Sequence, residues 1–135
     1  MSGPAPGGRQ LAFLGPEWLA ALAAAAARAT LPPDLRLTLQ QVVIGAGEAP
    51  EVRYHLVAED GNLSVHEGQA ASPDLTVTQS YELAAALSRG ETNAQQALSA
   101  GRLKVSGNVE LLARHARALT TVADVYAELR AVTAY

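Results

Sequence analysis

The sequence of 135 residues contains no cysteine, which excludes disulfide bonds, thiolate catalysis and zinc held by cysteines. Aromatic residues make up only 4% of the chain, so few aromatic faces are available to stack on sugars or bases. Charge is low and balanced, with 13 acidic and 10 basic residues, so we expect no binding to nucleic acid. These absences favour an aliphatic ligand.

Long hydrophobic runs are absent too. The apolar stretch at residues 18–27 is about half as long as the roughly 20 residues that a membrane span needs, so we predict no such span. Arg9 precedes this alanine-rich stretch as in a signal peptide, but Pro16 and Glu17 interrupt the hydrophobic region. We therefore expect a cytoplasmic protein.

The composition predicts one globular domain behind a short tail. The chain is 49% hydrophobic and 17% charged, and its length suits a single hydrophobic core. Residues 1–12 begin with a stretch rich in glycine and proline and are expected to form a disordered tail. Residues 13–135 are expected to form the domain.

The first expected elements of this domain are a helix and a strand. Pro16 suits the first position of a helix, whose buried face should carry Trp18 and Leu22. Residues 35–44 alternate between apolar and polar until Gln41 interrupts the period, which predicts a strand with a bulge.

A hairpin is predicted around a two-residue turn at Asp60 and Gly61. On one face this register pairs Ala58 with Leu63, Leu56 with Val65, and Tyr54 with Glu67. On the other face it pairs His55 with His66. Facing imidazoles can hold two corners of a metal site, but no third ligand shares their face and His115 lies far along the chain. We therefore expect no metal.

The sequence offers no catalytic constellation. Glu82 and Glu110 have no partner at acid–base spacing, and the serines lack a nucleophile elbow or a neighbouring base. An α+β enzyme with a buried His/Asp dyad is a remote alternative, disfavoured because all three histidines fall on expected surfaces. We expect neither catalysis nor a cofactor.

Residues 74–112, DLTVTQSYELAAALSRGETNAQQALSAGRLKVSGNVELL, carry the clearest succession of elements. β-Branched alternation predicts the strands, and capping residues and glycines mark where the helices begin and end. The expected order is a strand at 74–78, a helix from Ser80 to Gly90, a short helix from Asn93 to Gly101, a strand at 103–107 and a helix capped by Asn108.

This segment resembles the sterol carrier protein type 2 domain family. The likeness is carried by the strand DLTVT, the helix start SYELAAAL, the linker RGETN and the strand GRLKVSGN, and it extends with decreasing specificity over residues 13–119. The resemblance implies a mixed sheet with helices on one face, and a fatty acyl chain, sterol or other lipid held in an apolar tunnel between them. It brings no catalytic motif.

The apolar residues of the C-terminal segment recur at helical spacings of seven, three, four and three from Leu112 to Leu129. We expect this amphipathic helix to cover its own domain. A lid over the tunnel and the seam of a homodimer are the alternatives. Thr120 and Thr121 lower helix propensity and mark a candidate hinge.

The sequence as a whole predicts an α+β fold, in which a five-stranded, mixed, mostly antiparallel sheet is covered on one face by helices that enclose an apolar tunnel. The expected function is binding or transfer of a small apolar ligand, such as a fatty acid, acyl-CoA or sterol-like lipid. The alternative is a non-catalytic accessory or dimerisation module beside an enzyme of lipid metabolism. The predicted lipid-binding residues, which would equally describe an ordinary core, are Trp18, Leu22, Leu56, Val65, Val77, Leu83, Leu87, Leu98, Leu103, Val105, Leu111, Leu112, Leu119, Val122 and Tyr126.

Overall fold

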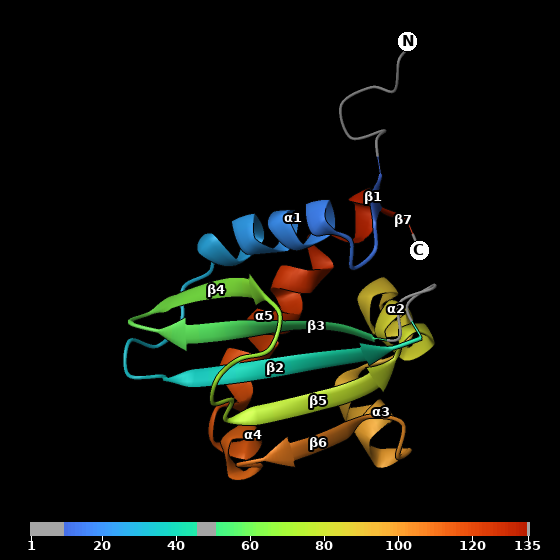
Figure 1. Cartoon of the computed structure of the whole chain (residues 1–135). Coiled ribbons are helices and arrows are strands. Elements are labelled where there is room, and N and C mark those ends of the chain that lie inside the picture. The colour runs from blue at the N-terminus through green and yellow to red at the C-terminus, as the bar shows by residue number, and fades with distance from the viewer. Residues whose placement is uncertain (1–9, 46–50, 135) are drawn as a thin grey trace.

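A five-stranded sheet with helices on one face forms the body of the molecule (Figure 1). The computed structural model describes residues 10–45 and 51–134 of the chain. The strand order is β4-β3-β2-β5-β6, in which β2 and β5 run parallel and the other neighbours run antiparallel. The predicted α+β fold with a mixed, mostly antiparallel sheet is therefore confirmed.

The elements of the described chain include the predicted helices and strands in the predicted order, and also three short ones near its ends that were not predicted. They are β1 (Leu11–Ala12), α1 (Pro16–Ala27), β2 (Leu37–Ile44), β3 (Glu51–Glu59), β4 (Asn62–Glu67), β5 (Leu75–Ser80), α2 (Tyr81–Arg89), α3 (Ala94–Ser99), β6 (Lys104–Gly107), α4 (Glu110–Arg114), α5 (Ala116–Ala127), η1 (Arg130–Val132) and β7 (Thr133–Ala134).

A second, two-stranded sheet joins the two ends of the described chain. Residues 1–9 of the expected tail lie outside the described residues, but Leu11 and Ala12 form β1, so ordered structure begins before Phe13. Strand β1 pairs in parallel with β7 (Figure 1). Beside this pair, the indole Nε1 of Trp18 donates a buried hydrogen bond of 3.1 Å to Oγ1 of Thr133.

The helix boundaries follow local capping chemistry. Ser80 Oγ accepts from the backbone N–H of Leu83 at 3.1 Å, and α2 ends at Gly90, whose φ of 80° suits a residue without a side chain. Asn93 caps α3 as predicted. The predicted cap at Asn108 is wrong, because α4 starts one residue later, with Val109 at the N-cap and no side-chain cap bond.

The hairpin between β3 and β4 has the predicted register throughout. Tyr54, Leu56 and Ala58 face Glu67, Val65 and Leu63, and His55 faces His66. Asp60 and Gly61 both have positive φ, of 53° and 79°, as a two-residue turn between antiparallel strands requires.

Strand β2 contains no bulge, so that prediction is wrong. Its residues pair without interruption with both β3 and β5. The apparent slip at Gln41 arises because both faces of β2 are buried: Gln41 faces the helices, while Gln40 on the opposite face is 0% exposed.

Gln40 is buried by residues 68–74, a segment that we call the strap. The strap leaves β4 and crosses β3 and β2, on the face away from the helices, to reach β5 (Figure 1). Gln40 Oε1 accepts from the N–H of Ala70 at 2.7 Å, and its Nε2 donates to the carbonyls of Gly68, Tyr54 and Gln41 at 3.1–3.3 Å. One glutamine thus satisfies strap groups that would otherwise be buried without partners.

The C-terminal helix is interrupted at His115 and not at the predicted hinge. His115, with φ of −117° and ψ of 34°, separates α4 from α5, whereas Thr120 and Thr121 lie inside α5 and bond to carbonyls four residues earlier. Helix α5 packs on its own domain: its Val125 is 2% exposed, and Leu129, two residues beyond the helix, is 4% exposed.

Candidate functional site

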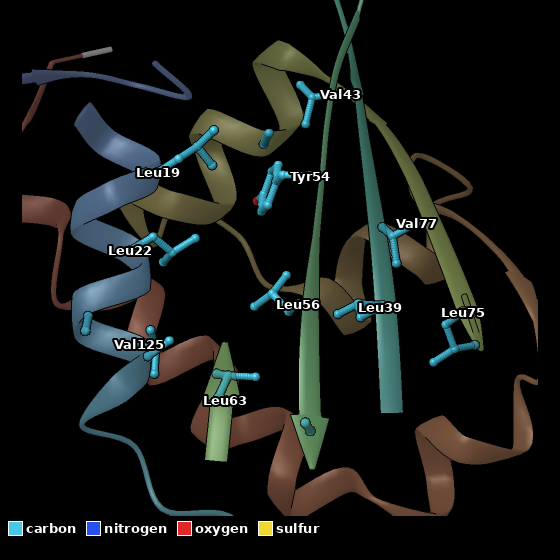
Figure 2. Packing of buried hydrophobic residues seen from close by; sticks show 14 of the residues in the cluster. Leu19, Leu22, Leu39, Val43, Tyr54, Leu56, Leu63, Leu75, Val77 and Val125 are labelled. Atoms are coloured by element: carbon cyan, nitrogen blue, oxygen red, sulfur yellow. The ribbon is translucent and has the colours of Figure 1, made fainter. Parts of the chain in front are cut away.

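The layer between sheet and helices contains a small apolar cavity of about 10 Å³, which is roughly the space of one water molecule. All of its lining side chains are leucine, alanine or valine. Figure 2 shows Leu22 of α1, Leu39 of β2 and Leu56 of β3 pointing into this layer.

The cavity is lined by residues from β2, β3, β4, α5 and the segment before β2. Three of the fifteen predicted site residues belong to it: Leu56, Leu119 and Val122. The other lining residues, which the sequence interpretation missed, are Leu31, Leu35, Leu37, Leu39, Ala58, Leu63 and Ala118. The alternation of leucines at 35, 37 and 39 could have identified part of this lining, because it places these side chains on one face of the sheet.

The remaining predicted residues surround this centre at different depths. The buried ones are Trp18, Leu22, Val77, Leu83, Leu103 and Leu111. The half-buried ones, packed against the core, are Val65, Leu87, Val105, Leu112 and Tyr126. Leu98 is 45% exposed on α3 and lies apart from the others.

A polar cluster adjoins the cavity on the helix side of the sheet. It consists of Gln41 on β2, Tyr54 on β3, Gln79 on β5 and Tyr126 on α5. The hydroxyls of Tyr54 and Tyr126 are 2.8 Å apart, and Gln79 Nε2 donates to Gln41 Oε1 at 2.9 Å. Gln41 also bonds Tyr126. The cluster lies next to the cavity lining along two elements: Gln41 follows Leu39 by two positions on the same face of β2, and Tyr126 follows a lining valine by one turn of α5.

Burial controls the protonation of both tyrosines in this cluster. Desolvation raises the pKa of Tyr54 well above its usual value, and the neighbouring Tyr126 raises it further. Desolvation likewise raises the pKa of Tyr126, although hydrogen bonds from Tyr54 and Gln41 oppose this shift. Both phenols are therefore neutral across the physiological pH range.

The histidine pair forms on the opposite face, as its register predicts. The rings of His55 and His66 stack with centroids 5.2 Å apart. His55 Nδ1 bonds the carbonyl of Gly68 on the strap, and His66 Nε2 bonds the Ser64 hydroxyl. Within residues 10–45 and 51–134, no group of three or more histidines and carboxylates is placed to hold a metal ion. The described helices also include none long and apolar enough to cross a membrane.

The class of domain is thus a mixed sheet backed on one face by helices, with a cavity lined by aliphatic side chains between the two layers. Comparison with sequence families matches residues 22–120 to the SCP-2 sterol transfer family. The chain therefore belongs to that family, as its resemblance to sterol carrier protein type 2 predicts. A search of curated proteins finds no match.

Solved structures agree with this assignment at the level of the fold. A crystal structure of sterol carrier protein 2 superposes with a TM-score of 0.72 at 20% identity, covering 86% of this chain and 98% of the other. A conserved protein of Thermus thermophilus, described as a candidate sterol carrier, gives 0.71 at 19% identity over 99% and 94% of the two chains. A palmitated sterol carrier protein 2-like protein from Aedes aegypti gives 0.55 at 25% identity over 65% and 76%.

Proposed function

We propose that this protein binds and transfers a single-chain apolar lipid, which lies between the sheet and α5. The observation that carries the proposal is the cavity lined only by aliphatic side chains in a member of the sterol transfer family. The relative that is described as palmitated supports an acyl chain as one candidate ligand. A non-catalytic role and a cytoplasmic location belong to the same proposal.

Hydrophobic transfer supplies enough free energy for such binding. A sixteen-carbon chain at about 0.8 kcal/mol per methylene gains roughly 12 kcal/mol on leaving water. Losses of translational and rotational freedom cost about 4 kcal/mol or more. The remainder of at most about 8 kcal/mol corresponds to micromolar binding, and any free energy used to open the protein weakens the affinity from that limit.

Opening is required because a cavity of about 10 Å³ cannot hold an acyl chain. Helix α5 contributes three lining residues, and the break at His115 separates it from α4. An outward shift of α5 about this break would widen the cavity between Leu56 on the sheet and Val122 on the helix. As the cavity widens, the predicted residues Val65, Val77 and Val105, which lie on the same face of the sheet, would join its wall.

Native mass spectrometry with added 1-dodecanol or dodecanoate tests the proposal. Ala118 lines the cavity at 5% exposure, whereas Ala123 lies exposed on the same helix. We expect Ala118→Leu to weaken lipid binding about tenfold, at a stability cost of about 1 to 3 kcal/mol for overpacking. Ala123→Leu is the matched control and should bind as the parent does. Absence of any lipid adduct on the parent, with either ligand, would refute the function.

A further inference from the structure

The hydrogen bonding of the polar cluster is incomplete. Gln79 is 8% exposed, and its Oε1 is a buried atom with no hydrogen-bond partner in the described structure. Its Nε2 is already engaged with Gln41. A buried amide oxygen without a partner loses the hydrogen bonds that it made to water, which is unfavourable unless another group bonds to it.

Reversing the amides does not remove the deficit. If Gln79 and Gln41 are both turned over, Gln41 becomes the donor to Gln79, and the Nε2 of Gln79 is left without a partner instead. The unpaired end of the Gln79 amide is therefore an oxygen in one orientation and an NH2 group in the other. A ligand group that suits both orientations must be able to donate a hydrogen bond and to accept one. A hydroxyl does both, whereas a carboxylate only accepts.

The cavity and the polar cluster follow one another along the helix side of β2. Along the helix side of β2, Leu37 and Leu39 line the cavity, Gln41 belongs to the cluster, and Val43 pairs with Gln79 on β5. Leu37 to Val43 spans about 20 Å at roughly 3.3 Å per residue. The site thus has an aliphatic part, the cavity, and a polar part, the cluster. A lipid with one hydrocarbon chain and one polar head group has the same two parts.

The chemistry of this end restricts the head group. Its four side chains are two neutral amides and two phenols, so the cluster itself brings no positive charge to balance a carboxylate. Transfer of an unpaired ionised carboxylate into such a layer is far more costly than transfer of a hydroxyl that makes hydrogen bonds.

We propose that Gln41, Tyr54, Gln79 and Tyr126 bind the head group of the lipid, and that they select an uncharged hydroxyl over a carboxylate. This inference rests on the proposed lipid-binding function and specifies its ligand class as single-chain alcohols. Gln79 is the residue that completes its hydrogen bonding when the alcohol binds.

Trp18 provides a built-in reporter for the test. It is the only tryptophan in the chain, and its ring centroid lies 6.4 Å from that of Tyr54 and 6.2 Å from that of Tyr126. Titrations of 1-dodecanol and dodecanoate at neutral pH, followed by this fluorescence and by native mass spectrometry, compare two ligands that differ only in the head group. We expect the alcohol to bind the parent about tenfold more tightly.

The variant Gln79→Leu should abolish this preference by weakening alcohol binding about tenfold and leaving dodecanoate binding nearly unchanged. Its unliganded thermal midpoint should change little, because the gain from removing the unpartnered Gln79 Oε1 is offset by loss of the bond that Gln79 Nε2 donates to Gln41 Oε1. Gln95→Leu, the same change at an exposed position on α3, should retain the preference.

The outcomes separate the two proposals. Equal or tighter binding of dodecanoate, or an unchanged preference in Gln79→Leu, would overturn the head-group inference while the lipid-binding function stands. Failure of the parent to bind either ligand would overturn both.

Discussion

Replacing Gln40 by leucine should destabilise the protein strongly, although the new side chain is apolar and the position is fully buried. Gln40 lies on the face of β2 that the strap covers and bonds both Gly68 and Ala70. Leucine cannot make these bonds, so the N–H of Ala70 would be buried without an acceptor and the strap would lose its attachment to the sheet.

The magnitude follows from the bonds lost. A buried N–H without a partner costs about 1 to 3 kcal/mol, and each further hydrogen bond contributes about 1 kcal/mol net. The carbonyls of Tyr54 and Gln41 belong to paired strands, so we count only the two strap bonds in full. We expect Gln40→Leu to lower the free energy of unfolding by about 3 kcal/mol, or the melting temperature by about 12 °C.

Urea unfolding followed by circular dichroism measures the change, and Gln79→Leu supplies the contrast. Both glutamines are buried, on opposite faces of the sheet, but Gln40 has partners for both side-chain ends and Gln79 Oε1 has none. The same substitution should therefore cost more at Gln40 than at Gln79, where it removes an unpartnered oxygen together with a single hydrogen bond, the one donated to Gln41 Oε1. A loss below about 1 kcal/mol at Gln40, or equal losses at both positions, would refute the reasoning.

Three further predictions concern other polar and aromatic contacts. Thr133→Val should cost about 1 to 2 kcal/mol in urea unfolding because the indole N–H of Trp18 loses its acceptor, while Thr133→Ser should retain most of the stability. Because the folded-state pKa values of Tyr54 and Tyr126 lie above the usual 10.0, the free energy of unfolding should be constant below about pH 10 and fall as the pH rises above it. Changing both tyrosines to phenylalanine should flatten this fall. An unchanged alkaline profile in that variant would contradict the raised pKa values. Replacing both members of the stacked histidine pair by glutamine should change stability by at most about 1 kcal/mol, and stoichiometric zinc in the parent, lost in this variant, would contradict their structural role.

The local signals in the sequence were sufficient for most of the fold. Period-two alternation and the turn at Asp60 and Gly61 determine the register of the hairpin, because a slip of one residue would expose its apolar face. Ser80, Gly90 and Asn93 mark helix ends through bonds that span only a few residues, so they were readable without tertiary information.

The errors occurred where distant segments meet. The double burial of Gln40 and Gln41 depends on the strap and on α5, neither of which is adjacent to β2 in sequence, so the pattern resembled a bulge. The candidate site was incomplete for the same reason: leucines such as Leu35 join the cavity only because α5 and β4 close over them. Periodicity indicates which face is buried, but it does not show where the interior is left empty.

The pairing of β1 with β7 determines when the fold can be completed during synthesis. Trp18 is made early, but its hydrogen-bond partner Thr133 follows 115 residues later. At about 5 to 20 residues per second, a ribosome needs roughly 6 to 23 s to cover that distance. Helix α1 must therefore wait beside an unfinished sheet, with its indole N–H unpaired, until the last strand has emerged from the exit tunnel. This corner of the fold therefore closes only after Thr133 has emerged, and a nascent chain stalled before Thr133 should leave it accessible to chaperones.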